Sequence, residues 1–414
     1  MTLISKAMQP LMAGDSVIRA MFEEGNRLAA VYGRENVYDF SLGNPNVPAP
    51  EAVNRAIRAV LEEEDPVSVH GYMSNAGYAD VRAAVAASLN RRFSAACSAD
   101  NLIMTAGAAA AMNIFLKVIL NPGDEVITFA PFFSEYRNYV GNYGGRLVVI
   151  PADTETFQPD LEGFSAAITE RTKAVIINTP NNPSGVIYSE EALRKMQSIL
   201  REREAAFETV ISVISDEPYR ELVYDGCTVP WVPALIPHTA VVYSYSKSLS
   251  LPGERIGWLL LPDTLPEFRE LLAAATMANR ISGFVNAPSL IQRALLRCVD
   301  ETADTERYNR NRELLYGKLT ALGFSCVRPQ GAFYLLVKAP DGDDGHFAAI
   351  CKEQRILVVP CSSFACPGYV RIAYCVSEGM ILRAQPAFRR VAEECGLREE
   401  ENRQGRQREE TEKR

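Results

Sequence analysis

The 414-residue sequence has only three histidines, His70, His238 and His346. That leaves little material for a histidine-based hydrolase or a histidine-rich metal site. No run approaches about 18 uninterrupted apolar residues, and the first ten residues lack the apolar core of a secretory signal. These absences predict a protein without a membrane span, and we expect it in the cytoplasm.

Paired cysteines and basic stripes are missing as well. The nine cysteines are scattered without a Cys-x-x-Cys pair, which favours reduced thiols over a disulfide framework. Cys361, Cys366 and Cys375 form the one cluster, and because their spacing fits no common zinc pattern, core packing explains them better. Lys and Arg total 43 against 51 Asp and Glu, a net charge of −8 that disfavours a nucleic-acid partner.

What the sequence does contain is a regular alternation of strands and helices. The length suffices for two or three domains, and 47% hydrophobic with 23% charged residues is ordinary for a globular protein. From residue 100 onward, short apolar runs alternate with long helical segments, which predicts a mainly parallel sheet covered on both faces. Strands are expected at 101–105, 125–129, 147–150, 174–178, 210–215, 240–243 and 258–261.

The two ends of the chain have different patterns. Helical spacing begins near residue 15, with Asp15 or Ser16 as the N-cap, and two more amphipathic helices are expected over 50–64 and 77–92. A loop between them carries the aromatic residue Tyr72. Residues 398–414 are almost wholly charged or amide-bearing, which predicts a frayed helix or a disordered tail.

The stretch from Ser244 to Gly257 concentrates polar chemistry directly after an apolar strand. A lysine at a buried strand end, Lys247, costs free energy unless it is paired or neutralised, and condensation with an aldehyde removes its free ammonium. Ser244 and Arg255 are residue types that hold a phosphate. Together these groups suit pyridoxal phosphate. A solvated loop with surface Lys and Arg explains this stretch alone equally well.

Three successive strands end in polar residues, namely Asn182, Asp216 with Tyr219, and Lys247. The carboxyl ends of parallel strands share one edge of a sheet, where ligands bind. Asp216 follows a strongly apolar run, so we expect it to be buried and to need a cationic partner such as a protonated pyridine nitrogen. At another strand end, Phe133 offers a flat face for stacking.

Small residues open the helix after residue 105. Gly107, Ala108 and Ala109 would leave the free N–H groups of that helix open to an anion. Close packing of an alanine-rich helix is an equally good explanation of the segment by itself.

Four motifs resemble the signatures of class I/II aminotransferases, the aspartate-aminotransferase-like enzymes of pyridoxal-phosphate fold type I. They are Asn182-Pro183-Ser184-Gly185, Asp216-Glu217-Pro218-Tyr219, Ser246-Lys247-(x)7-Arg255-Ile256-Gly257 and Tyr369-Val370-Arg371-Ile372-Ala373. The resemblance runs from the first helix to about residue 396. It implies an α/β fold whose large domain, 46–290, has a mainly parallel seven-stranded sheet between helices. A smaller α+β domain would comprise 291–397 with an N-terminal arm, 1–45, and 398–414 would be the charged tail.

The resemblance also implies roles for single residues. Lys247 would form the Schiff base with the cofactor, Asp216 would pair with the pyridine nitrogen, and Arg371 would hold the substrate α-carboxylate near Gly43 and Asn182. Because family members are dimers with shared sites, Tyr72 would reach the phosphate of the neighbouring subunit. The full set of implied cofactor contacts is Gly107, Ala108, Ala109, Phe133, Asn182, Asp216, Tyr219, Ser244, Ser246, Lys247, Arg255 and Tyr72.

Some positions depart from the family pattern. Alanine stands at 108 and 109 where a polar residue is common, and the ring-stacking residue is Phe133 rather than Tyr or Trp. The segment from Pro360 to Cys366 replaces a glycine-bearing loop.

The predicted function is transamination between an L-amino acid and a 2-oxo acid such as 2-oxoglutarate. Carbon–sulfur β-elimination on the same fold is the alternative, and a non-catalytic regulatory role ranks below it. Acidic substrates would need a second cation, for which Arg280 is the one candidate, although a surface position explains it better.

Overall fold

The computed structural model describes residues 2–6, 8–13 and 17–397, and its internal contacts divide the chain into two compact units. The large unit consists of Pro45–Arg307 and Gln330–Ala332. The small unit contains the described residues up to Asn44, then Tyr308–Pro329, and the described residues from Phe333 onward. This division differs from the predicted boundary at residue 290 because α13 (Ser289–Leu295) packs against helices of the large unit. The functional roles assigned to the predicted domains stay predictions.

A seven-stranded sheet forms the centre of the large unit, and its spatial order is β2-β8-β7-β6-β5-β3-β4. Its pairs are parallel except for those that β8 makes with β2 and β7. The predicted fold class is confirmed, and each predicted strand is present with ends shifted by a few residues. The strands are β2 (Leu102–Thr105), β3 (Glu125–Phe129), β4 (Arg146–Ile150), β5 (Thr172–Asn178), β6 (Ser212–Asp216), β7 (Thr239–Ser244) and β8 (Gly257–Leu260).

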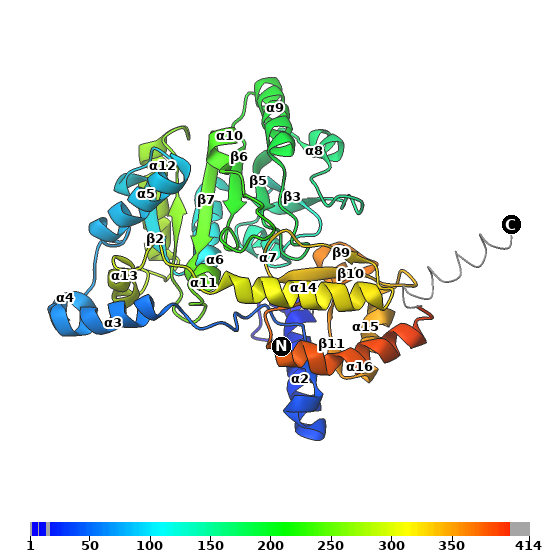
Figure 1. The fold of residues 1–414 in the computed structure, drawn as a ribbon. Coiled ribbons are helices and arrows are strands. Elements are labelled where there is room, and N and C mark those ends of the chain that lie inside the picture. The colour runs from blue at the N-terminus through cyan, green and yellow to red at the C-terminus, as the bar shows by residue number, and fades with distance from the viewer. Residues whose placement is uncertain (1, 7, 14–16, 398–414) are drawn as a thin grey trace. The chain divides into compact units, whose positions relative to one another are not determined.

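Helices cover this sheet. Ile127, Val175 and Val213 pair across neighbouring strands, so they share one face, where they pack with residues of α8, α9 and α10. Helix α6 packs on β7 and β8, and Figure 1 shows α6 next to β7. The remaining elements of this unit are α3 (Glu51–Glu63), α4 (Pro66–His70), α5 (Ala79–Phe93), η2 (Ala99–Asn101), α6 (Ala108–Ile119), α7 (Tyr136–Gly141), α8 (Leu161–Ala167), α9 (Glu190–Phe207), α10 (Val232–Leu235), α11 (Tyr245–Ser248) and α12 (Phe268–Ile281).

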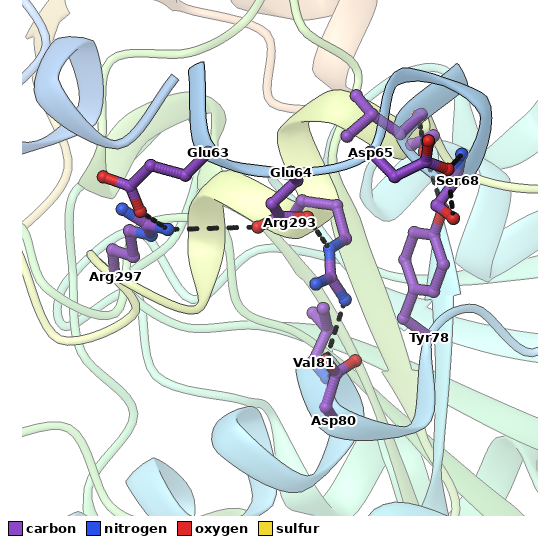
Figure 2. Close-up of polar contacts among 11 residues, drawn as sticks. Glu63, Glu64, Asp65, Ser68, Tyr78, Asp80, Val81, Arg293 and Arg297 are labelled. Carbon is purple, nitrogen blue, oxygen red and sulfur yellow. Dashed lines mark hydrogen bonds and ion pairs between the residues drawn. The ribbon is translucent and has the colours of Figure 1, made fainter. Parts of the chain in front are cut away.

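Helix α4 lies where the sequence predicts only a loop. Asp65 caps it by accepting a bond from the backbone N–H of Ser68 at 2.9 Å, and Pro66 stands in its first turn, where a missing N–H costs nothing. Figure 2 shows this cap beside a group of ion pairs. In that group Arg293 of α13 bonds Glu64 at 2.7 Å and Asp80 at 2.8 Å. These contacts tie the residue before the α4 cap to α13 and to the first turn of α5.

The small unit contains two sheets. The parallel pair is β1 (Tyr38–Asp39) with β11 (Ile356–Leu357). The antiparallel sheet has the order β12 (Val359–Pro360), β13 (Tyr369–Ala373), β10 (Tyr334–Lys338) and β9 (Cys326–Val327). Its other elements are α1 (Met8–Ala13), α2 (Val17–Tyr32), η1 (Arg34–Asn36), α15 (Asp344–Glu353), η3 (Cys361–Phe364) and α16 (Glu378–Glu394), together with α14 (Thr305–Ala321) from Tyr308 onward.

Several sequence expectations concern the chain ends or the cysteines. The proposed caps Asp15 and Ser16 and the charged segment 398–414 lie outside the described residues. The cluster of Cys361, Cys366 and Cys375 is buried, as core packing predicts. No helix within the described ranges is both long and apolar enough to cross a membrane.

Candidate active site

Lys247 follows the end of β7 in the middle of the large unit's sheet. The chain turns there into the short helix α11, and the Ser244 hydroxyl caps it by accepting a bond from the Ser246 N–H at 3.2 Å. The sequence predicts a loop at this point, which is wrong for Tyr245–Ser248, because the Ser244 cap starts a helical turn. The Lys247 side chain is half-buried, with Nζ 5.9 Å from the centre of the Tyr219 ring.

Asn178 joins the ends of two neighbouring strands. It is paired with Asp216 across β5 and β6, and its side-chain amide donates to the Asp216 carbonyl at 2.8 Å. Its side-chain oxygen accepts the backbone N–H of Asn182 at 2.7 Å. Asn182, Asp216 and Tyr219 are all buried. Asn178 therefore holds the loop that carries Asn182 against the end of β6, a role that sequence reasoning missed.

Asp216 is a buried carboxylate at the last position of β6. Its side chain accepts a hydrogen bond from the Tyr136 hydroxyl at 2.5 Å. Burial raises the pKa of Asp216 to about 7, which the hydrogen bond from Tyr136 opposes and the charge of Glu217 reinforces. The prediction that Asp216 is buried is confirmed.

Glu217, the next residue, forms its side-chain bonds with groups other than Tyr136. It accepts bonds from the Ser215 hydroxyl at 2.7 Å and from the Arg220 guanidinium. Arg220 also lies over the rings of Phe93 and Trp231, at 4.9 and 5.2 Å from their centres. Glu217 is therefore committed to a buried ion pair, whereas the Asp216 side chain is bonded by a neutral phenol.

Donor groups converge at the start of α6. Gly107 is the N-cap of this helix, with φ at +85°, and a Cβ built on it would lie 2.8 Å from Nη2 of Arg255 and 3.5 Å from the Ser244 hydroxyl. The Arg255 guanidinium donates to the carbonyls of Pro252 at 2.9 Å and Ala106 at 3.2 Å. A guanidinium beside the positive end of a helix dipole is favourable when an anion lies between them.

The other predicted cofactor contacts lie near these groups. Ala108 and Ala109 are the first residues of α6. The Ser246 hydroxyl lies 2.7 Å from the Ser244 hydroxyl, and both residues are buried. Phe133 is half-buried, and its ring meets the Tyr136 ring edge-on with centres 5.8 Å apart.

Arg371 lies on β13 in the antiparallel sheet of the small unit. Its side chain is 1% exposed, and Nη2 donates to the Ser41 carbonyl at 2.6 Å. The guanidinium carbon lies 4.5 Å from the ring centre of Tyr334 and 5.1 Å from that of Phe364. At Gly43 a Cβ would come within 1.9 Å of the Tyr334 hydroxyl, so only glycine fits there.

The unusual segment after Pro360 positions Phe364. The Cys366 N–H donates to the Cys361 carbonyl at 2.9 Å, and the Ala365 N–H donates to the Ser362 carbonyl at 3.1 Å. This pair of bonds is the Schellman pattern, and Ala365 occupies its left-handed position with φ at +58°. The turn therefore closes with alanine in the left-handed position that glycine usually occupies.

Tyr72 and Arg280 are at the surface of the large unit. The Tyr72 side chain is 95% exposed, and together with Phe284 it lines a surface hollow next to α4. Arg280, near the end of α12, is also exposed.

The large unit contains a group of hydrogen-bond donors at the start of α6 and a buried carboxylate at the end of β6. These suit the phosphate end and the ring-nitrogen end of pyridoxal phosphate. Hydroxyls, a guanidinium and the start of α6 supply donors for a phosphate, and the glycine there leaves space that a Cβ would fill. The buried Asp216 carboxylate suits a protonated ring nitrogen. Lys247 supplies the amine. The donor set thus fits this cofactor.

Comparison with known sequences agrees with this chemistry. A family model described as aminotransferase class I and II matches residues 35–387. The aspartate/prephenate aminotransferase of Thermus thermophilus is 33% identical over 358 residues, covering 84% of this chain and 89% of that protein. The aspartate aminotransferase of Thermotoga maritima is 29% identical over 381 residues, covering 90% of this chain and 93% of that protein.

Solved structures show the same fold. An aminotransferase from Eubacterium rectale superposes with a TM-score of 0.93 at 46% identity, covering 95% of this chain and 99% of that one. The Thermus thermophilus aspartate aminotransferase solved with maleate gives a TM-score of 0.83 at 29% identity, covering 94% of this chain and 100% of that one.

The fold and the site define a pyridoxal-phosphate enzyme of fold type I. The chain belongs to the class I and II aminotransferase family. It is an aminotransferase, and like the aspartate aminotransferase type it uses pyridoxal phosphate.

Proposed function

We propose that Lys247, Asp216 and Arg371 carry out transamination between an L-amino acid and a 2-oxo acid, with 2-oxoglutarate as the acceptor. The observation that carries the proposal is the buried Asp216 carboxylate, whose side chain is bonded by the Tyr136 phenol. It stands at the end of β6, next to the strand that leads to Lys247. A carboxylate buried in this way stabilises a cation brought to it.

The large unit holds the cofactor. Asp216 pairs with the ring nitrogen, Asn182 and Tyr219 donate to the ring oxygen, and Phe133 covers the ring. The phosphate is held by hydroxyls, a guanidinium and backbone amides. These belong to Ser244, Ser246, Arg255, Gly107, Ala108 and Ala109.

When bound, pyridoxal phosphate supplies a carbon that accepts the amino group and a ring that stores an electron pair. Lys247 then has the proton-transfer role: its Nζ removes the proton from the substrate Cα and later returns a proton. The half-buried position of Lys247 beside the Tyr219 ring limits the water around Nζ.

Arg371 binds the α-carboxylate of the substrate, and Gly43 and Asn182 are the other residues assigned to substrate binding. A planar guanidinium suits a carboxylate because two parallel N–H groups meet two oxygens. The bond to the Ser41 carbonyl and the rings of Tyr334 and Phe364 fix the orientation of this guanidinium.

The protein works as a homodimer in the cytoplasm, and Tyr72 reaches the phosphate held by the neighbouring subunit. The nearly complete exposure of Tyr72 supports this assembly, since a tyrosine in this position has little to pack against within its own chain. Exposed apolar side chains on α4, on α12 and in the segment after α12 support it too. They are Val67, Met277, Ile281 and Phe284.

Replacement of Lys247 tests the proposal directly. Lys247→Ala should lower the transamination rate by at least about a thousandfold, the upper range for loss of a positioned base. Borohydride should fix the cofactor to the parent protein at Lys247 and not to the variant. Lys195→Ala is the control, because Lys195 pairs with Glu191 on the exposed face of α9. Full activity in Lys247→Ala would disprove the assignment.

A substrate screen tests the proposed acceptor. Each amino acid is incubated with 2-oxoglutarate, and glutamate formation is measured with and without the cofactor. Release of pyruvate from cystathionine in the absence of any 2-oxo acid would instead identify β-elimination. If another 2-oxo acid is the better acceptor, the proposal of 2-oxoglutarate fails while the roles of Lys247 and Asp216 stand.

A further inference from the structure

Tyr136 is a buried phenol whose hydroxyl is directed at Asp216. The O–H donates to Oδ2 of Asp216 at 2.5 Å, and the Tyr136 side chain is 1% exposed. The two residues are 80 positions apart in the sequence. This bond therefore joins the start of α7 to the end of β6.

The Tyr136 ring is held firmly in this position. It stacks on Phe132, with ring centres 6.3 Å apart, and meets Phe133 edge-on. Its backbone N–H donates to the Phe133 carbonyl at 3.0 Å. These contacts hold the ring on several sides with its hydroxyl directed at Asp216.

The phenol acts only as a donor. Burial and the neighbouring Asp216 charge raise the pKa of Tyr136 well above its usual value, so its hydroxyl keeps its proton. The other close carboxylate, Glu217, is taken up by Arg220 and Ser215. Tyr136 is thus the group that stabilises the charged form of Asp216.

We propose that Tyr136 is a positioning residue that keeps the proton shared by Asp216 and the cofactor's ring nitrogen on the nitrogen. The proposal rests on the proposed function, in which Asp216 faces that nitrogen. It goes further by naming Tyr136 as the group that decides whether this proton lies on the ring nitrogen or on the Asp216 carboxyl group.

The two arrangements differ in a single bond. Either the nitrogen carries N–H beside a carboxylate, or the nitrogen is neutral beside a carboxyl O–H; no electron and no second proton moves. In a buried site the charged arrangement is costly, so the neutral one competes with it. A hydrogen bond to a charged group shifts such an equilibrium by about 10- to 100-fold. The Tyr136 bond therefore favours the protonated nitrogen, the form in which the ring best withdraws electrons.

Nitrogen NMR of the loaded enzyme tests this, because protonation moves the signal of an isotope-labelled ring nitrogen. Tyr136→Phe removes one oxygen and keeps the ring contacts. Its signal should move from the parent position toward that of the neutral ring, which Asp216→Asn defines. Tyr188→Phe is the control, since Tyr188 is also a buried phenol of the large unit and packs edge-on against Phe129. It should leave the signal at the parent position.

Each result decides between the possibilities. A Tyr136→Phe signal at the parent position overturns the proposal, and so does an equal movement in Tyr188→Phe. If Asp216→Asn itself leaves the parent signal unchanged, the pairing in the proposed function is what fails. Should Tyr136→Phe not fold, p-aminophenylalanine at position 136 keeps a weaker donor in the same shape. It should give a smaller movement in the same direction, and no movement would overturn the proposal.

Discussion

At the scale of a single residue, burial gives Asp216 its chemistry. The carboxylate ends a strand whose five residues are all buried, and among the described residues the donor to its side chain is the Tyr136 phenol. A carboxylate of this kind resists ionisation until a cation arrives. In the proposed site, cofactor binding and the charge state of Asp216 are thereby coupled.

This coupling predicts how the stability of the cofactor-free protein depends on pH. The folded state binds a proton at Asp216 more tightly than the unfolded state, because the pKa is raised from 3.8 to about 7. Its contribution to stability is therefore present at low pH and lost as the pH rises through about 7. Relative to Asp216→Asn, the parent should lose about 3 kcal/mol of unfolding free energy between about pH 5 and about pH 8.

Urea unfolding of both cofactor-free proteins at several pH values measures this difference. Asparagine keeps an acceptor for the Tyr136 hydroxyl, so the comparison isolates the charge. Parallel stability curves for the two proteins would show that Asp216 does not titrate in this range.

Arg371→Lys tests the proposed binding of the substrate α-carboxylate by Arg371. Lysine keeps the charge but loses the second parallel hydrogen bond, about 1.5–3 kcal/mol for a charged partner. The KM of every amino and oxo acid should rise at least about tenfold. Loss of the bond to the Ser41 carbonyl should also lower the unfolding free energy by about 1 kcal/mol.

The exposed Arg383 of α16 provides the matched control, as Arg383→Lys should leave both quantities unchanged. Steady-state kinetics and thermal melting give the two readouts. Should Arg371→Lys melt early while every KM stays at the parent value, Arg371 is a structural residue and another group binds the carboxylate.

At the scale of an element, the start of α6 depends on one glycine. Gly107 has φ at +85° and lies next to Gly257, whose own Cβ would come within 3.0 Å of the Gly107 Cα. The backbone of β8 and the N-terminus of α6 thus approach each other closely. This approach brings the donors of Arg255 and Ser244 to the first amides of the helix.

Gly107→Ala should therefore weaken cofactor binding more than folding. Gly107 has φ at +85° and ψ at 175°, a conformation almost exclusive to glycine that costs alanine about 1–3 kcal/mol, and the new methyl also meets Nη2 of Arg255. Gly123→Ala is the matched control, since Gly123 has φ at +92° but no atom within 4 Å of its Cβ position. Both variants should lose similar stability, and only Gly107→Ala should raise the Kd for the cofactor, by about tenfold or more. An absorbance titration measures the Kd, and equal values for the two variants would contradict the prediction.

Elements with a strong pattern were predictable, and those without one were not. The apolar strands and the polar residues behind them gave the sheet and the positions of Asn182, Asp216 and Lys247. Helix α4 has five residues, too few for a periodic pattern, although the pair Asp65-Pro66 is a helix-start signal. The Tyr136 bond to Asp216 spans 80 residues, and no local pattern can reveal which distant phenol meets a carboxylate.

At the scale of the whole molecule, the division into units follows packing rather than sequence boundaries. Arg293 of α13 pairs with Glu64 and Asp80, so the segment beyond residue 290 stays with the large unit. The short segment Gln330–Ala332 also belongs to the large unit, and nothing in its amino-acid composition predicts this. The proposed assembly with a second copy concerns the exposed apolar residues on α4, on α12 and after α12.

The proposed dimer makes two measurable predictions. Sedimentation should give a mass about twice the 45.7 kDa of one chain. Tyr72→Phe should leave that mass unchanged yet raise the Kd for the cofactor by about 10- to 100-fold, the loss of one hydrogen bond to a charged group. Tyr32→Phe is the control, because Tyr32 is 50% exposed on α2 of the small unit.

The two measurements test dimer formation and the contact of Tyr72 with the cofactor phosphate separately. A monomer whose cofactor affinity is insensitive to Tyr72→Phe would refute the shared site altogether. A dimer with the same insensitivity would keep the assembly but remove Tyr72 from the phosphate site. A tyrosine that is 95% exposed in its own chain should matter to the cofactor only through a neighbouring subunit. Dilution below the dimer dissociation constant should therefore weaken cofactor binding in the parent and leave Tyr72→Phe much less affected.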